Sequence, residues 1–232
     1  MEMTGNVLVK ETRGPGGRGG RAARQVLTRN LVPGTATYGE DLVKIDGTEY
    51  RSWDPFRSKL AAAMIKGLPE DIIRRGDKVL YLGTSTGTTT SHVSDIVGEK
   101  GLVIGVEFSS RVARQFVENV ARIRKNVIPY IADARESSRF GSFGRVDVVY
   151  CDVAQQDQTE IAIDNCRRNL KPDGRLILIV KSRSIDVIKD PKEVFRQESS
   201  KLERNGFSVE KVIELSPFDR DHALISAVLR GA

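Results

Sequence analysis

The chain has 232 residues, with 37 Lys and Arg against 31 Asp and Glu, which gives a formal net charge of +6. A chain of this length buries roughly two thirds of its extended surface on folding, so its core needs no disulfides or structural metal. The first 30 residues carry six basic and two acidic side chains, which leaves a net charge of +2 on the rest. This nearly neutral body argues against an architectural protein that coats nucleic acid.

The two cysteines, Cys151 and Cys166, form no C-x-x-C motif, so the sequence predicts neither a zinc site nor a disulfide framework. No apolar run approaches the roughly 18 residues that a membrane span needs, and the N-terminus has no signal-peptide pattern. We therefore expect an intracellular, cytoplasmic protein that binds no metal and no membrane.

The N-terminal part, residues 1–52, predicts a small antiparallel β-rich domain. Residues 13–21 are too rich in glycine and arginine for regular structure, and we expect a mobile loop there. Turns are expected at Pro33-Gly34 and at Asp46-Gly47. The expected strands are Asn6–Lys10, Gln25–Asn30, Asp41–Ile45 and Thr48–Arg51.

Residues 53–232 predict a second domain in which strands alternate with helices, as in a doubly wound α/β sheet. Continuous apolar runs such as Val146–Cys151 suit strands that are buried on both faces. The connection after Val209–Leu215 is too short for a crossover helix, so the last two strands should form an antiparallel hairpin. Such a sheet favours a methyltransferase over a dehydrogenase. The expected helices are Lys59–Lys66, Thr88–Val97 and Ser110–Arg124, and the seven strands are Lys78–Leu82, Leu102–Glu107, Val127–Ile131, Val146–Cys151, Leu176–Val180, Val209–Leu215 and Ala223–Leu229.

The loop after the first of these strands, Gly83-Thr-Ser-Thr-Gly87, is the first candidate binding element. Its glycines allow a tight turn, and the following helix N-terminus offers free N–H groups to a carboxylate. A phosphate could use the same donors, so the loop alone leaves the ligand open. It lacks both G-x-G-x-x-G and the Walker lysine.

Acidic residues at three further strand ends extend this candidate site. Glu107 stands where a carboxylate accepts hydrogen bonds from the ribose of an adenosine cofactor, and Phe108 could lie against the adenine. Asp133, followed by Ala134, could accept the adenine amino group, and Asp152 ends the fourth strand. Each feature has a plainer interpretation as a structural turn, a helix cap or a surface charge. Their joint occurrence at four strand ends favours one cofactor crevice.

Several motifs then indicate a family. The most specific are Ser91-His92-Val-Ser-Asp-Ile-Val-Gly98 and Asp152-Val-Ala-Gln155, accompanied by Arg57-Ser-Lys59, Lys181-Ser-Arg-Ser-Ile-Asp186 and Asp221-His222. Through them the chain, from about residue 30 to its end, closely resembles archaeal fibrillarin, the ribose 2′-O-methyltransferase of box C/D guide ribonucleoproteins. The resemblance implies a Rossmann-like S-adenosylmethionine-dependent methyltransferase fold. With the glycine loop, it implies that S-adenosyl-L-methionine is held by Gly83, Thr88, Thr89, Glu107, Phe108, Asp133, Ala134, Asp152, Val153, Ala154 and Gln155.

The resemblance also nominates Lys59, Asp152, Lys181 and His222 as the catalytic set. Methyl transfer to a ribose hydroxyl is an in-line displacement, so an enzyme must align the reacting atoms and assist loss of the proton. We assign Lys181 to proton acceptance or to orientation of the hydroxyl. The plainer alternatives are a solvated strand-end lysine, a surface lysine on a helix and a loop histidine.

The predicted function is therefore S-adenosylmethionine-dependent 2′-O-methylation of ribose in rRNA and tRNA. The partners implied by the resemblance are a Nop-type scaffold protein, a kink-turn-binding protein of the ribosomal L7 type and a box C/D guide RNA. The alternatives are a methyltransferase with a protein or small-molecule acceptor, a non-catalytic RNA-binding subunit and a nucleotide-dependent oxidoreductase. The sequence defines no docking surface; the N-terminal domain and the amphipathic segment Ile185–Leu202 are candidates, and the plainer interpretation of the latter is a helix packed on its own sheet.

Overall fold

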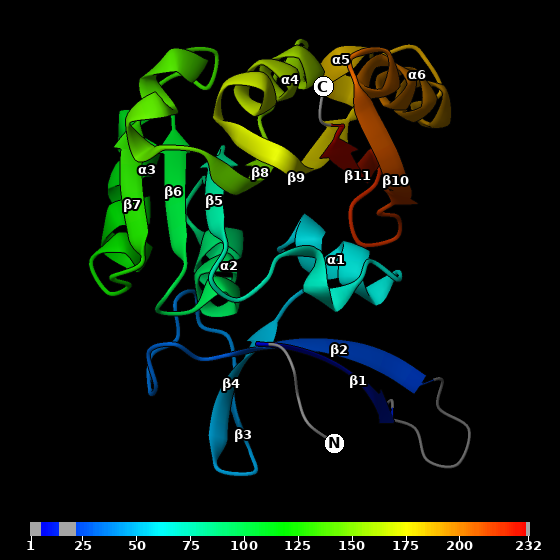
Figure 1. The fold of residues 1–232 in the computed structure, drawn as a ribbon. Coiled ribbons are helices and arrows are strands. Elements are labelled where there is room, and N and C mark those ends of the chain that lie inside the picture. The colour runs from blue at the N-terminus through cyan, green and yellow to red at the C-terminus, as the bar shows by residue number, and fades with distance from the viewer. Residues whose placement is uncertain (1–5, 14–21, 231–232) are drawn as a thin grey trace.

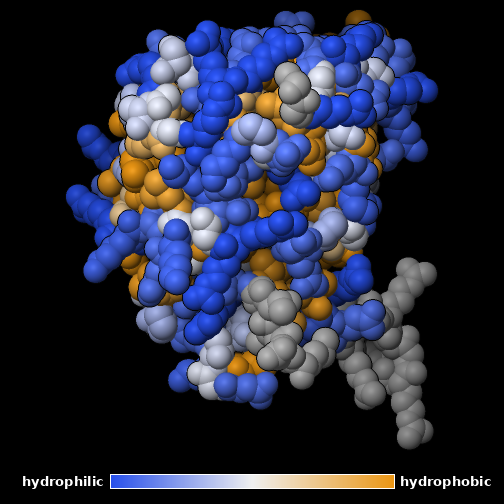
Figure 2. All heavy atoms as spheres, in the orientation of Figure 1, coloured by the Kyte–Doolittle hydropathy of each residue, from blue (hydrophilic) through white to orange (hydrophobic). Residues whose placement is uncertain are grey.

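The structure is a computed structural model, and it describes residues 6–13 and 22–230. Two β-sheets dominate it, a four-stranded sheet near the N-terminus and a seven-stranded sheet flanked by helices (Figure 1). The predicted mobile loop at 13–21 lies, apart from its first residue, outside the described residues. No helix in the described ranges is long and apolar enough to cross a membrane. Figure 2 shows hydrophilic side chains over most of the visible face, with hydrophobic ones between them.

The N-terminal sheet has the strand order β1-β2-β4-β3, and every pair in it is antiparallel. The predicted β-rich element is confirmed, and the β3–β4 turn falls at Asp46-Gly47, where both residues have positive φ. Strand β4 extends two residues beyond the predicted Arg51, because the Trp53 side chain at its end is buried in the core cluster that also contains residues of α1 and α2. The strands are β1 (Val7–Arg13), β2 (Ala22–Arg29), β3 (Leu42–Ile45) and β4 (Thr48–Trp53).

The large sheet has the order β10-β11-β9-β8-β5-β6-β7. The five neighbouring strands β9, β8, β5, β6 and β7 run parallel to one another. Strand β11 is antiparallel to both of its neighbours, β9 and β10, so the predicted terminal hairpin is confirmed. The strands are β5 (Lys78–Leu82), β6 (Leu102–Glu107), β7 (Val127–Ile131), β8 (Val146–Cys151), β9 (Leu170–Lys181), β10 (Phe207–Glu214) and β11 (His222–Leu229).

Among the elements that differ from the sequence-based expectation, three differ most. The helix expected over Ser110–Arg124 ends at Phe116 and continues as a π-helix to Ala121. Strand β9 begins at Leu170, six residues before the predicted Leu176. Leu170 already pairs with Val146 of β8, and after an irregular segment the pairing continues at Arg175. A helix over Gln158–Asn169 had not been predicted. The helices are α1 (Lys59–Ile65), α2 (Thr88–Val97), α3 (Ser110–Phe116), α4 (Gln158–Asn169), α5 (Ser182–Ile185) and α6 (Pro191–Arg204), with shorter turns η2 (Glu70–Ile72), η3 (Val117–Ala121) and η4 (Ser137–Phe143).

Both faces of the large sheet are covered by apolar side chains. In β5, Val79 and Tyr81 belong to a cluster that includes α1 and α2, whereas Leu80 and Leu82 belong to a second cluster with α4 and α6. Successive side chains of a strand point to opposite faces, so an uninterrupted apolar run supplies both clusters. The two apolar clusters hold the sheet between two layers of helices. Polar groups stand at the carboxyl ends of its strands.

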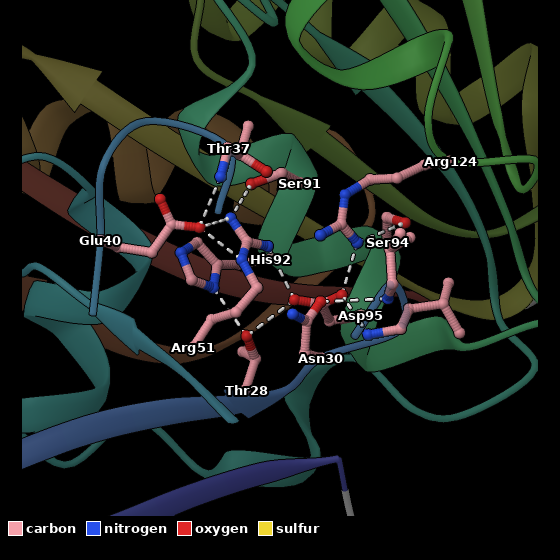
Figure 3. Close-up of polar contacts among 12 residues, drawn as sticks. Thr28, Asn30, Thr37, Glu40, Arg51, Ser91, His92, Ser94, Asp95 and Arg124 are labelled. Atoms are coloured by element: carbon pink, nitrogen blue, oxygen red, sulfur yellow. Dashed lines mark hydrogen bonds and ion pairs between the residues drawn. The ribbon is translucent and has the colours of Figure 1, made fainter. Parts of the chain in front are cut away.

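A buried ionic network joins the N-terminal sheet to α2 (Figure 3). Arg51 of β4 lies 2.8 Å from the carboxylate of Asp95 on α2, and both side chains are 0% exposed. The opposite oxygen of Asp95 pairs with Arg124, and Arg51 also pairs with Glu40. Because each charge meets a partner of opposite sign, the network compensates the cost of removing these groups from water.

His92, one turn before Asp95, belongs to the same interface. Its two ring nitrogens lie 2.7 Å from the Thr28 and Tyr38 hydroxyls, and its ring stacks on Trp53 at a centroid distance of 4.6 Å. Burial, aided by the nearby Arg51 guanidinium, lowers the pKa of His92 well below its usual value, so the ring is neutral. Residues of the Ser91–Gly98 motif therefore hold α2 against the N-terminal sheet.

We expect Asp95→Asn to lower the free energy of unfolding by about 3–5 kcal/mol, since it leaves the buried Arg124 guanidinium without its carboxylate partner and Arg51 with Glu40 alone. Denaturant unfolding measures this loss. Asp71→Asn is the control, because the Asp71 side chain is 70% exposed in its pair with Arg74 and should change the value by no more than about 1 kcal/mol. Equal effects of the two variants would contradict the importance of the network.

Candidate active site

A cavity of about 400 Å³ opens at the carboxyl ends of the parallel strands, where ligands bind in open α/β sheets. Nine of the eleven residues predicted to hold a cofactor line it: Gly83, Glu107, Phe108, Asp133, Ala134, Asp152, Val153, Ala154 and Gln155. Lys181, predicted to be catalytic, also lines it. The structure adds Ser85, Val106, Ala132, Arg135 and Ile161, which the sequence had not nominated as site residues.

Gly83 brings two of the loops together. It follows β5 with φ +86°, a left-handed conformation that favours glycine, and its N–H donates to the Val106 carbonyl at 2.9 Å. A Cβ atom at this position would lie 2.9 Å from the carbonyl oxygen of Asp152. The loop after β5 can therefore contact the backbone after β8 directly only because residue 83 has no side chain.

Glu107 is held by the two loops on either side of it. One carboxylate oxygen accepts the Ser85 N–H and the other accepts the Ser109 N–H, both at 3.0 Å. Each oxygen keeps a further lone pair for a ligand. A fixed carboxylate that lines a cavity is well suited to accept two neighbouring hydroxyl groups.

The cavity is also lined by an exposed ring and by a network of polar groups. Phe108 is 73% exposed, so a face of its ring is available to a planar ligand. The Asp133 carboxylate accepts the N–H of Arg135 at 2.9 Å, and the Arg135 guanidinium lies 2.8 Å from Asp157 and 3.1 Å from Gln155. Arg135 thus links the loops that follow β7 and β8.

Thr88 and Thr89 do not line this cavity. They form the first turn of α2, where the Thr88 carbonyl accepts the Ser91 hydroxyl at 2.8 Å. The Thr89 hydroxyl lies 2.9 Å from that of Ser58. The contact with Ser58 connects α2 with the start of α1. A role in binding stays a prediction for both threonines.

The four predicted catalytic residues lie in one charged cluster next to the cavity. Lys181 Nζ is 2.8 Å from Asp152 Oδ1 and 2.9 Å from the Asp152 carbonyl. Lys59 Nζ, which α1 brings from the other side, is 3.3 Å from Asp152 Oδ2. One carboxylate therefore holds two ammonium groups from separate elements.

Asp219 completes this cluster, and the sequence did not identify it. Its carboxylate is 3.8 Å from Lys59 Nζ and 2.8 Å from His222 Nδ1. The same nitrogen lies 2.6 Å from the Arg220 carbonyl, so both neighbours of Nδ1 are acceptors and this nitrogen carries the proton. The loop conformation that brings Asp219 between Lys59 and His222 leaves no periodic signal in the sequence.

Gln158, at the start of α4, is a second residue that the sequence missed. Its side chain is buried, and its amide accepts the Lys181 N–H at 3.0 Å and donates to the Gln155 carbonyl at 2.9 Å. It thereby fixes the end of β9 relative to the Asp152–Gln155 segment. Because the sequence predicted no helix over Gln158–Asn169, it gave no reason to nominate this glutamine as a site residue.

Cys151 lies directly before Asp152 but does not contribute a nucleophile. Both cysteines are free and buried. Burial raises the pKa of the Cys151 thiol to about 12, so the thiol stays protonated near neutral pH. Within the described ranges no group of three or more His, Cys, Asp or Glu residues could hold a metal ion.

The strand order, the terminal hairpin and a cavity bordered by strand-end carboxylates define a Rossmann-like methyltransferase fold. Comparison with known proteins narrows this class. The chain belongs to the fibrillarin family, whose model matches residues 17–231. The resemblance drawn from the sequence motifs is therefore confirmed.

Individual relatives agree with this assignment. The chain is 51% identical over 208 residues to a fibrillarin-like rRNA/tRNA 2′-O-methyltransferase of Saccharolobus islandicus, and the match covers 89% of each chain. It is 43% identical to Aeropyrum pernix fibrillarin, solved with natively bound S-adenosyl-L-methionine, with a TM-score of 0.83 and coverage of 96% and 94%. It is 37% identical to fibrillarin in a fibrillarin/Nop5p complex, with a TM-score of 0.80 and coverage of 89% and 94%.

We expect Gly83→Ala to lower the free energy of unfolding by about 2–4 kcal/mol, because a Cβ adds both a strained φ and an overlap with Asp152. Gly76→Ala is the matched control, since Gly76 has φ +89° but open space around its Cβ position. That control should cost about 1–2 kcal/mol. The two losses are compared by thermal or denaturant unfolding, and equal losses would rule out the close approach of the two loops.

Proposed function

We propose that the chain is an S-adenosylmethionine-dependent methyltransferase that modifies the 2′-hydroxyl of ribose in rRNA and tRNA, as the catalytic subunit of a box C/D guide ribonucleoprotein. The observation that carries the proposal is the position of the Lys59–Asp152–Lys181 cluster at the border of a cavity suited to an adenosine cofactor. The activity printed for the 51% identical relative supports the same reaction.

The cavity fits the cofactor in size and in chemistry. About 400 Å³ lies in the usual range for small-molecule sites. Glu107 would accept the ribose hydroxyls, Phe108 would contact the adenine ring, and Asp133 would accept the adenine amino group. When bound, S-adenosylmethionine supplies an electrophilic methyl group on a positively charged sulfonium. The Asp152–Gln155 segment would hold the donor end of the molecule.

The charged cluster provides what a ribose hydroxyl needs. This hydroxyl is a poor nucleophile at neutral pH, so a nearby base or a fixed hydrogen bond must assist loss of its proton. Lys181 would orient the hydroxyl or accept its proton, while Asp152 holds both lysine ammonium groups in place. His222 would be oriented by Asp219, whose carboxylate also lies near Lys59.

Partners would bring the RNA to this site. The similarity to fibrillarin in a fibrillarin/Nop5p complex supports a Nop-type scaffold protein as one of them. A kink-turn-binding protein of the ribosomal L7 type and a guide RNA follow from membership of the family. A net charge of only +2 outside the first 30 residues suits an enzyme that depends on such partners for RNA affinity. A division into domains at residues 1–52 and 53–232, and a cytoplasmic location, belong to the same proposal.

The deciding experiment measures transfer of a radiolabelled methyl group from S-adenosylmethionine to a target RNA, with and without the scaffold, the L7-type protein and a matched guide. We expect transfer to the single ribose that the guide selects, and none to an RNA with a 2′-deoxynucleotide at that position. Methylation of the deoxy control, or of protein or small molecules instead of RNA, would refute the proposal.

We expect Lys181→Ala to retain S-adenosylmethionine binding and to lower the rate of methyl transfer by about 10²- to 10⁴-fold, the usual contribution of a positioned proton acceptor. Calorimetric titration and single-turnover transfer measure the two effects. Lys171→Ala is the control, because Lys171 pairs with Asp147 at 2.6 Å at the opposite end of β9. A wild-type rate for Lys181→Ala would remove this lysine from the mechanism.

A further inference from the structure

Gln158 contacts the backbone of two residues that line the cavity. Its side chain is 0% exposed at the start of α4. The amide oxygen accepts the Lys181 N–H at 3.0 Å, and the amide nitrogen donates to the Gln155 carbonyl at 2.9 Å. Gln155 belongs to the segment proposed to hold the donor end of the cofactor, and Lys181 belongs to the charged cluster. One buried side chain therefore connects the cofactor segment with the lysine.

The contact with Lys181 continues the sheet beyond the end of a strand. Strand β8 pairs with β9 as far as Leu178, and β9 extends past this pair to Lys181. On the β11 side of the strand, the Ser182 N–H donates to the Asp221 carbonyl at 3.1 Å. Successive N–H groups alternate between the two sides of a strand, so the Lys181 N–H faces the side where β8 has ended. The Gln158 amide takes the place of a backbone carbonyl there.

The helix that carries Gln158 is fixed against the sheet. Ile161, Ala162 and Cys166 of α4 are buried in the core cluster that also contains residues of β8 and β9. Gln155, in contrast, is exposed and lies in a segment without helix or strand structure. A buried amide that uses both its donor and its acceptor holds its two partners in one arrangement. The rigid helix thus sets the position of a less regular segment relative to the end of β9.

We infer that Gln158 is a positioning residue for methyl transfer, which sets the place of the Lys181 ammonium relative to the cofactor segment. Gln158 is not among the described residues that line the cavity, so it acts through Lys181. A shift of the Lys181 main chain would move Nζ away from Asp152 Oδ1, which lies at 2.8 Å. Misplacement of a reacting or orienting group by about 1 Å costs roughly 100-fold in rate. The inference rests on the proposed function.

The first test is Gln158→Met in the assembled particle. Methionine keeps a straight side chain of similar volume but has no amide, so the Lys181 N–H and the Gln155 carbonyl lose their partner. We expect single-turnover methyl transfer at saturating S-adenosylmethionine and RNA to slow by about 10- to 100-fold. The Kd for S-adenosylmethionine, measured by calorimetry, should rise by no more than about threefold, because a positioning defect lowers the rate more than ground-state binding.

Asn169→Leu is the matched control. Asn169 lies at the other end of α4, is 2% exposed and donates to the Ser137 carbonyl at 3.0 Å. Neither Asn169 nor Ser137 is among the described residues that line the cavity. Both variants remove a buried amide contact to the main chain, so both should lower the Tm, but Asn169→Leu should keep the wild-type transfer rate. Wild-type rates for both folded variants would show that Gln158 serves stability alone, and the inference would fail.

The second test determines whether Gln158 acts through Lys181. Gln158→Met is combined with Lys181→Ala, which removes the ammonium group but keeps the main-chain N–H. If Gln158 positions this ammonium group, Gln158→Met should slow the Lys181→Ala enzyme by less than about twofold. Effects that multiply in the double variant would show that Gln158 acts by another route, which overturns the inference.

Gln158→Asn provides a second variant in case Gln158→Met does not fold. Its side chain is one methylene shorter, so the amide cannot keep both contacts at hydrogen-bond distance, and transfer should again slow more than cofactor binding weakens. A folded Gln158→Asn variant with the wild-type rate would contradict the inference. If the wild-type particle methylates no RNA, the proposed function fails and this inference with it. An active wild-type particle with equally active Gln158 variants refutes the positioning role alone.

Discussion

The carboxylate of Asp152 is the group on which the site depends. It lines the cofactor cavity, and it holds Lys181 from the end of β9 and Lys59 from the start of α1. Its side chain is only 14% exposed, so its attraction to the two ammonium groups is weakened less by solvent than that of a surface pair. Without this carboxylate, two positive charges would face each other beside the binding cavity.

The backbone around Asp152 is fixed from three directions. Its N–H donates to the Leu82 carbonyl, and its own carbonyl lies against Gly83 and accepts a hydrogen bond from Lys181. On the far side, Gln158 connects the following loop with β9. A charge held by this many main-chain contacts needs little reorganisation when a ligand binds, which is the usual advantage of a preorganised site.

The predictions from the sequence were best where the signal was local. Strand positions followed from apolar runs, and the predicted order of elements led to the observed sheet with its terminal hairpin. The same reasoning failed for α4, whose sequence Gln158–Asn169 is polar and has a weak apolar face, and for the change to a π-helix after Phe116. It also gave no role to the Ser91–Gly98 motif, since the partners of His92 and Asp95 lie on another sheet.

By itself, the sequence determined the fold class, the family and most residues of the cavity, because strand-end residues of parallel strands converge on one edge. Only the tertiary structure decided that Asp219 joins Lys59 to His222, that Gln158 supports Lys181, and that Thr88 and Thr89 are not among the residues that line the cavity. These contacts join positions up to 160 residues apart, as between Lys59 and Asp219. Their distances depend on sheet register and loop conformation, which no local pattern of residues records.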